Sequence, residues 1–214
     1  MKANVSKFWV TAATVAGVVG FGSLAVAAPI LPGGVQSPAV PEPDPVNATL
    51  VQTTGPVAFA AATYSGSLTS SVFVNDASNP FGPNGLTFTY QLVNNPGQDS
   101  DSIGRMTVAS FLGFNTDASF NPTVPVGGVA PTSIDRSNSG AVMGFSWLTG
   151  LDPNSASAVL VVQTNSTQFN PTFASIIDGT TTQVASLAPL PIPEPASLAV
   201  VGLGALAAVR RRRA

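Results

Sequence analysis

The residues that could do chemistry in this 214-residue chain are carboxylates and hydroxyls, because it contains no cysteine and no histidine. The missing thiols exclude a disulfide framework and a thiolate metal site, and the missing imidazoles remove the commonest general base. A pair of carboxylates could still hydrolyse a glycoside. Sequence spacing does not show that two of them meet, and most stand beside Asn, Pro, Ser or Gly, where aspartate often serves as a turn residue. The candidates are Asp76, Asp117, Asp135, Asp152 and Asp178.

Two short segments match catalytic or cofactor motifs only in part. Residues 144–148 begin like the nucleophile elbow of a hydrolase, but Leu148 replaces the second glycine. With no histidine in the chain and no lysine beyond Lys7, neither a Ser-His-Asp triad nor a Ser-Lys dyad can activate Ser146. Residues 202–207 match G-x-G-x-x-A without the βαβ context of a dinucleotide site. The sequence therefore predicts no catalytic residue and no enzyme activity.

Residues 99–104, Asp-Ser-Asp-Ser-Ile-Gly, start like a calcium-binding loop. The fifth position is Ile103 and the twelfth is Ser110, so the carboxylate ligands of an EF-hand are missing there. A looser calcium site, made of carboxylate and carbonyl oxygens between β-loops, stays open beside a plain solvated acidic loop. No cofactor is required by any motif, and Ca²⁺ is the one metal that the sequence leaves possible.

Three aromatic residues, Tyr64, Tyr90 and Trp147, are candidates for a platform on which a sugar could stack. Alternation places Trp147 on the same strand face as Phe145 and Met143. This pattern favours core packing for Trp147 over sugar binding.

Charge is scarce and strongly segregated. Charged residues make up 8% of the chain, against about 25% in typical soluble domains. Residues 28–195 hold all ten acidic residues and only two basic ones, a net charge of −8. No basic footprint for nucleic acid is present, so nucleic acid is excluded as a partner.

The N-terminus has the pattern of a secretory signal peptide. Lys2 and Lys7 form a basic region, an apolar run follows, and residues 25–27 (Ala-Val-Ala) are an A-x-A cleavage signal. The alternative is a retained anchor, since residues 8–28 would cover about 31 Å as a helix. We expect cleavage by signal peptidase, and the cleavage-site residues are Ala25, Ala27 and Ala28.

The C-terminal residues form a second apolar segment with a basic end. Residues 196–209 are predicted to form a helix of about 21 Å, which is short of the ~30 Å hydrocarbon core. The arginines that follow would stay on the cytoplasmic side, so the middle of the chain is translocated. A helix of this length is suited to transient contact with the membrane. Its flanking residues are Pro193, Glu194 and Pro195 on one side and Arg210, Arg211, Arg212 and Arg213 on the other.

This order of Pro-Glu-Pro, apolar helix and arginine block resembles a PEP-CTERM sorting signal. The resemblance implies recognition by an exosortase, a membrane-embedded transpeptidase-like enzyme, with cleavage near the Pro-Glu-Pro. It also implies delivery to the surface or extracellular matrix of a Gram-negative-type bacterium. Residues 193–195 would then be recognised by another enzyme. A second Pro-Glu-Pro, at residues 41–43, lacks the helix and the arginines and lies in a proline-dense stretch that predicts a stiff linker over residues 28–55.

The middle of the chain has the period-two alternation of β-strands, with Gly-, Asn- and Pro-containing turns between them. Many short strands of this kind predict an all-β, jelly-roll-like β-sandwich. The region is also loosely similar, at residues 157–165 and 176–179, to the all-β ectodomains of other PEP-CTERM proteins. The expected strands are 68–74, 86–92, 106–108, 141–147 and 158–162, and Asp178-Gly179 is expected to join 173–177 to 180–184 in a hairpin.

Together these features predict an exported, non-enzymatic structural protein of the cell surface or of an exopolysaccharide matrix, membrane-associated before processing. The alternatives are a carbohydrate- or calcium-dependent adhesion module and a secreted glycoside hydrolase that uses paired aspartates. The predicted organisation is a signal peptide (1–27), a Pro-rich linker (28–55), a β-sandwich (56–189) and a sorting signal (190–214).

Overall fold

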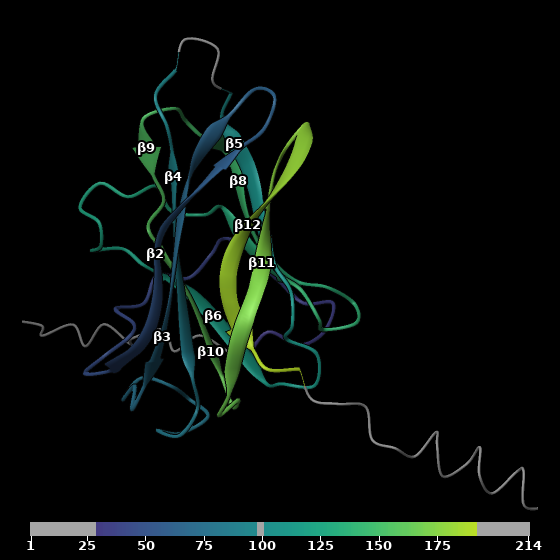
Figure 1. The fold of residues 1–214 in the computed structure, drawn as a ribbon. Coiled ribbons are helices and arrows are strands. Elements are labelled where there is room, and N and C mark those ends of the chain that lie inside the picture. The colour runs from purple at the N-terminus through teal and green to yellow at the C-terminus, as the bar shows by residue number, and fades with distance from the viewer. Residues whose placement is uncertain (1–28, 98–100, 192–214) are drawn as a thin grey trace, which may run out of the picture.

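The chain forms two antiparallel β-sheets that pack face to face (Figure 1). The computed structural model describes residues 29–97 and 101–191, and twelve strands lie within them. This part of the chain contains no helix that is long and apolar enough to cross a membrane. The prediction of an all-β sandwich is confirmed.

Both sheets are built from strands that are distant in sequence, because from β4 to β11 the chain passes repeatedly between them. Sheet A has the order β1 (Val35–Gln36), β7 (Ser133–Arg136), β8 (Met143–Leu151), β5 (Ile103–Val108), β11 (Phe169–Asp178), β12 (Thr180–Pro189). Sheet B has the order β2 (Thr49–Ala60), β3 (Ser65–Val74), β4 (Thr87–Asn94), β10 (Val159–Thr164), β6 (Thr116–Asn121), and β9 (Ser155–Ala156) pairs with β4.

Alternating apolar side chains fill the space between the sheets. On β4, Phe88, Tyr90 and Leu92 are fully buried. The β4–β10 register sets Tyr90 opposite Leu160, and Leu160 is also fully buried. Side chains two residues apart lie on one face of a strand, so this row forms the core layer of sheet B. The strands expected from alternation are therefore present, with bounds shifted by a few residues.

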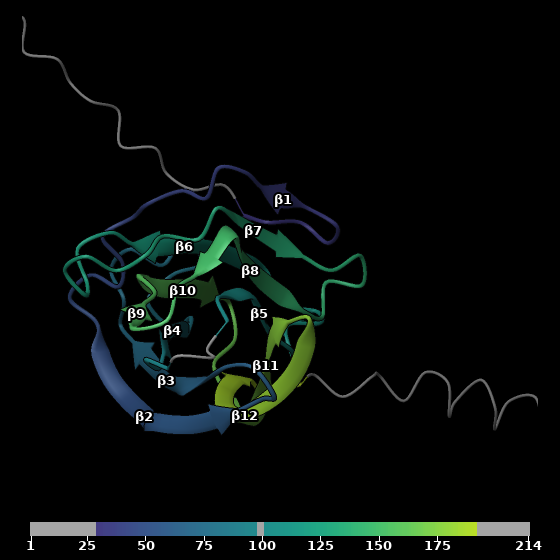
Figure 2. The ribbon, with the colours of Figure 1, turned by 90° about the horizontal axis from the view of Figure 1, so that it is seen from above.

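The expected hairpin at Asp178-Gly179 is confirmed and is longer than predicted. Asp178 pairs with Thr180 across the turn, and Gly179 takes a positive φ of 61°, which suits glycine. Its second strand, β12, lies beside β2 and β3 and closes one side of the sandwich (Figure 2). The hydroxyl of Tyr90 donates to the Leu187 carbonyl at 2.9 Å, which fixes β12 to sheet B.

Residues 29–48 belong to the sandwich, which corrects the expectation of a linker over 28–55. Ile30 is buried in the core, β1 pairs with β7, and β2 begins at Thr49. The Glu42 amide donates to the Phe120 carbonyl at 2.9 Å, so this segment covers the edge of β6. A proline-rich backbone is already extended, and its remaining amides and carbonyls can pair with a strand edge.

The two ends of the sandwich carry different loops (Figure 1). We call the end at which β12 finishes the exit end, and the opposite one the far end. The exit end consists of residues 30–34, 75–86, 109–115, 137–142, 165–168 and 190–191. The far end consists of residues 61–64, 95–97, 101–102 and 152–154 and the turn at Asp178–Thr180.

Candidate functional site at the exit end

The last strand carries the chain to the exit end and stops there. β12 ends at Pro189, and the Leu190 amide donates to the Gln168 carbonyl at 3.0 Å. Pro191 is the last residue that the structure describes. The sandwich therefore holds the chain to within three residues of Pro193, where the predicted sorting tripeptide begins.

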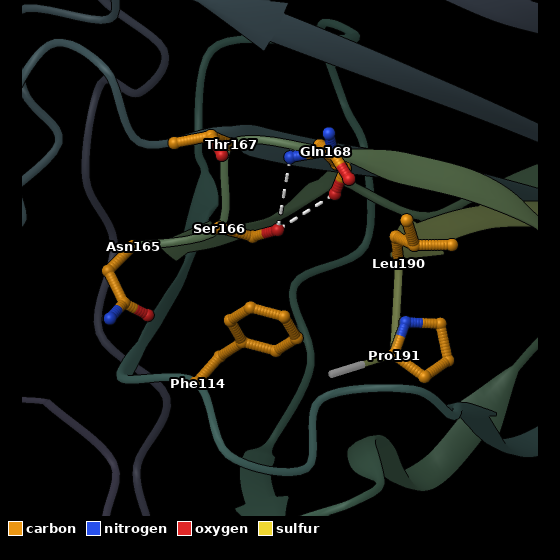
Figure 3. A pocket seen from close by; sticks show the side chains of 7 residues that line it. All are labelled: Phe114, Asn165, Ser166, Thr167, Gln168, Leu190 and Pro191. Carbon is orange, nitrogen blue, oxygen red and sulfur yellow. Dashed lines mark hydrogen bonds between the residues drawn. The ribbon is translucent and has the colours of Figure 1, made fainter. Parts of the chain in front are cut away.

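A shallow pocket of about 330 Å³ opens beside this exit (Figure 3). The Phe114 ring forms one wall, and Leu190 and Pro191 stand across from it. The third side is the turn after β10, in which the buried Ser166 hydroxyl donates to the Gln168 carbonyl at 2.7 Å. The lining residues are Phe114, Asn165, Ser166, Thr167, Gln168, Leu190 and Pro191, and none of them carries a charge or an acid–base group. The pocket can offer apolar surface and neutral hydrogen-bonding groups.

Arg136 at the end of β7 holds the exit end together from inside. Its side chain is 5% exposed and donates from Nη1 to the Ile30 carbonyl at 3.1 Å and from Nε to the Gly140 carbonyl at 3.0 Å. Its Nη2 donates to the carbonyls of Phe111 and Phe114 at 3.0 and 2.7 Å. Burial lowers the pKa of the guanidinium, which still stays charged because its ordinary value is so high. One buried cation thus fixes three separate segments around the exit pocket.

Arg136 could not be recognised from the sequence, since a lone arginine in a short strand gives no local signal. The indirect signal is scarcity: residues 28–195 contain only Arg105 and Arg136 as basic side chains. Arg105 forms a half-exposed ion pair with Asp135, with Nη1 to Oδ1 at 2.6 Å.

The two ends differ in charge. In the described residues of the exit end, the ionisable side chains Asp76 and Arg136 are both buried, so no charge reaches its surface. Exposed leucines stand there instead: Leu31 is 72% exposed, Leu112 52% and Leu190 40%. The far end carries Asp101, Asp152 and Asp178, of which the first two are exposed.

The five candidate aspartates do not form an accessible pair. Asp135 forms an ion pair with Arg105, while Asp152 and Asp178 lie in separate turns of the far end. Asp76 and Asp117 are 1% and 2% exposed. A glycoside cannot reach carboxylates that are buried in this way.

Asp76 and Asp117 nevertheless differ sharply in their environment. Burial alone would raise the pKa of Asp76, but hydrogen bonds from Ser78, Thr87, Gln163 and the Val46 amide outweigh it and lower that pKa.

Asp117 shows the opposite balance. Its Oδ1 is buried without a hydrogen-bond partner. Burial, with a smaller contribution from the nearby Asp44 carboxylate, raises the pKa of Asp117 to about 6.

The possible calcium loop lies at the far end, partly outside the described residues. Asp99 and Ser100 are outside them, Asp101 is exposed, and the Ser102 hydroxyl donates to Asp152 Oδ1 at 2.9 Å. In the described residues no three Asp, Glu, His or Cys side chains come together in a way that could hold a metal ion.

The proposed aromatic platform is wrong, because all three of its members are in the core. Tyr64 and Trp147 are 3% exposed and Tyr90 is fully buried. Trp147 also donates from Nε1 to the Val129 carbonyl at 3.3 Å. Core packing of Trp147, which alternation favoured, is confirmed. Ser146 is half-buried, and its hydroxyl accepts a hydrogen bond from Arg105 Nη1 at 2.6 Å, the atom that also bonds Asp135.

Several sequence predictions fall on residues that the structure does not describe. These are the cleavage-site residues Ala25, Ala27 and Ala28, the two apolar segments, and the sorting residues Pro193, Glu194, Pro195 and Arg210 to Arg213. They stay predictions as far as structure is concerned.

Comparison with known families gives one result, and it falls on the residues that leave the exit end. Residues 191–213 match the PEP-CTERM protein-sorting motif. Comparison with curated proteins and with solved structures gives no significant match. The match starts at Pro191, the residue after Leu190, whose amide is hydrogen-bonded to Gln168. The chain thus carries a PEP-CTERM protein-sorting motif directly behind a β-sandwich, as is consistent with a protein sorted by an exosortase.

Proposed function

We propose that this chain is a non-enzymatic structural protein of the cell surface or the exopolysaccharide matrix, delivered there by an exosortase. The observation that carries the proposal is the junction at Leu190 and Pro191. Every strand of the described residues ends before the sorting motif begins, the last of them at Pro189. Cleavage near residues 193–195 would release the sandwich without removing any of its strands.

In this proposal, other enzymes recognise and cleave the sorting residues. Signal peptidase removes residues 1–27, and the exosortase recognises Pro193, Glu194 and Pro195. The arginines at 210–213 keep the end of the chain on the cytoplasmic side while the sandwich is outside.

The surface of the sandwich supports a structural role in a hydrated matrix. Its charged residues are few, and its exposed polar groups are mostly hydroxyls and amides. Such groups can hydrogen-bond to polysaccharide without competing ion pairs. Asp76 and Asp117 are buried and Asp135 is paired with Arg105, which favours a non-enzymatic role over a glycoside hydrolase.

Cell fractionation with a matched pair of variants tests the proposal. Glu194→Ala should block processing and leave the protein in the membrane fraction. Glu42→Ala changes the other Pro-Glu-Pro, at residues 41–43, and should be processed and delivered like the wild type. The mass of the delivered protein should correspond to loss of residues 1–27 and of the tail near residue 195. Unchanged delivery of Glu194→Ala, and of a variant with serine at residues 210–213, would refute exosortase sorting.

A calcium-assisted adhesion module is the second candidate, favoured by the acidic loops of the far end. The side chain of Asn94 donates to the carbonyls of Asp101 and Leu151, and Ser102 bonds Asp152, so two acidic loops are tied together. A glycan array read with and without calcium distinguishes the roles. Binding that chelation abolishes, and that Asp101→Asn and Asp152→Asn weaken, would favour the adhesin.

A further inference from the structure

We propose that the exit end of the sandwich lies against the lipid headgroup layer before processing, with Leu31, Leu112 and Leu190 in contact with it. This inference rests on the proposed function, since it requires that the sorting tail enters a membrane. It adds an orientation: the exit end faces the bilayer and the far end points away from it.

The tether between the sandwich and the apolar run is short. Leu190 is fixed by its hydrogen bond to Gln168, and the apolar run begins at Ala196. Six residues span at most about 20 Å when fully extended. The polar layer on each side of a bilayer occupies about 5–8 Å of that distance. The body of the protein cannot move far from the membrane surface once the tail is inserted.

This short tether leaves from one end of a long body. β11 has ten residues, which corresponds to about 33 Å at ~3.3 Å per residue. The far end therefore stands a further strand length from Leu190 in any upright orientation. Of the two ends, the exit end is the one that can rest on the lipid without stretching the tether.

The difference in charge between the two ends favours the same orientation. The described surface of the exit end carries no ionised side chain, while the far end presents Asp101 and Asp152. Anionic lipid headgroups repel carboxylates and leave neutral amides and hydroxyls unaffected. Turning the far end toward the membrane would therefore be disfavoured, and turning the exit end toward it carries no electrostatic penalty.

The exposed apolar side chains of the exit end also favour contact with lipid. Leu190 and Leu31 each line a pocket that Phe114 also lines, and Leu112 is exposed two residues before Phe114 in the same loop. Arg136 holds the loops that carry Leu31 and Leu112 in place. The surface is thus preorganised, and its neutral groups at Asn165 and Gln168 can bond headgroup oxygens.

The test uses the full chain in phospholipid nanodiscs. Because the protein has no cysteine, a single fluorophore can be placed by Asn138→Cys at the exit end or by Thr63→Cys at the far end, both exposed positions. Lipid carrying a nitroxide on its headgroup should quench the Asn138 probe several-fold more than the Thr63 probe. Equal quenching at the two positions would overturn the proposal.

A second set of variants shows which residues make the contact. Leu31→Asp with Leu112→Asp should lower quenching of the Asn138 probe several-fold, while the tether still keeps it above that of the Thr63 probe. Leu148→Asp, at a leucine that is 86% exposed on β8 outside the exit end, should leave quenching unchanged. Unfolding curves confirm that each variant is folded. Quenching that survives the double substitution would overturn the assignment to these leucines.

The remaining outcomes separate this inference from the sorting proposal. Glu194→Ala should abolish processing and leave quenching intact, so a failure of either result concerns one proposal alone. If the Asn138 probe is shielded only when an exosortase is added to the nanodiscs, the exit end contacts the enzyme and the lipid proposal is wrong.

Discussion

The Nη1 atom of Arg136 donates a hydrogen bond to the backbone oxygen of Ile30 at 3.1 Å, across 106 positions of sequence. The same guanidinium holds the loop that contains Phe111 and Phe114. The N-terminal segment of the sandwich and the wall of the exit pocket therefore share one anchor. A buried charge, satisfied by carbonyl oxygens alone in the described residues, organises the end from which the sorting motif leaves.

Replacing this anchor should be costly. Arg136→Met removes four hydrogen bonds to buried carbonyls, two of which, at Gly140 and Phe114, lose the donor shown for them, so we expect the free energy of unfolding to fall by about 3–5 kcal/mol. Urea denaturation of the chain without its leader and tail measures this loss. Arg105→Met removes the half-exposed pair with Asp135 and should cost about 1 kcal/mol or less. Equal losses in the two variants would contradict the anchoring role.

Alternation made the central strands predictable, because one buried face imposes a period of two on the sequence. The run from Leu86 to Leu92 and the turn at Asp178-Gly179 are examples. The order of the strands was not predictable, since pairings such as β5 with β11 join segments more than sixty residues apart. β6 was also missed, because Asp117 and Ser119 are polar although they are buried, and because its edge is paired with the distant residues Val40 and Glu42.

Stability should depend on pH through Asp117. Its folded-state pKa of about 6 lies above the ordinary value of 3.8, so the folded protein binds this proton more tightly than the unfolded chain. The contribution is present at low pH and is lost as pH rises to about 6. Above that pH the loss is about 3 kcal/mol, at 1.36 kcal/mol per pKa unit. Asp117→Asn should therefore stabilise the protein at pH 7 and have little effect at pH 4, measured by urea denaturation.

Asp76 serves as the control with the opposite sign. Its pKa is lowered by four hydrogen bonds, so its contribution is present above pH 4 and is lost as pH falls further. Asp76→Asn should destabilise the protein at pH 7, and the difference from the wild type should shrink toward pH 3. A stabilising effect of Asp76→Asn at neutral pH would contradict this account of the two carboxylates.

The exit end shows which features of a site can be predicted from sequence. The sorting motif could be recognised because its three parts are contiguous and ordered. The aromatic residues could not be assigned from type alone: Tyr64 and Tyr90 use their hydroxyls to bond the backbone of sheet A, at Ile176 and Leu187. The apolar character of the exit end was not predictable, since only the fold places the exposed Leu31, Leu112 and Leu190 at the same end of the sandwich.

A pair of serines joins the two sheets beside the strand that leads to the motif. The hydroxyl oxygens of Ser70 on β3 and Ser186 on β12 are 2.8 Å apart and buried. Ser186→Ala leaves the other hydroxyl unpaired and should cost about 1–2 kcal/mol. Replacing both serines by alanine should cost much less than the sum of the single changes, as a double-mutant cycle reports. Additive losses would show that the two hydroxyls do not interact.

Deleting the proline-rich N-terminal segment should unfold the edge of sheet B. A chain that starts at Pro45 lacks Ile30 and the backbone partners of β6. Arg136 also loses the Ile30 carbonyl as a hydrogen-bond acceptor. Compared with a chain that starts at Pro29, we expect a loss of about 3 kcal/mol or more in the free energy of unfolding, because buried apolar surface and paired backbone are both removed. Both chains end at Pro191, so the sorting tail does not affect the comparison. A linker would give identical unfolding curves and rapid proteolysis within residues 29–48, whereas a segment packed on the sandwich should resist the protease until the whole domain unfolds.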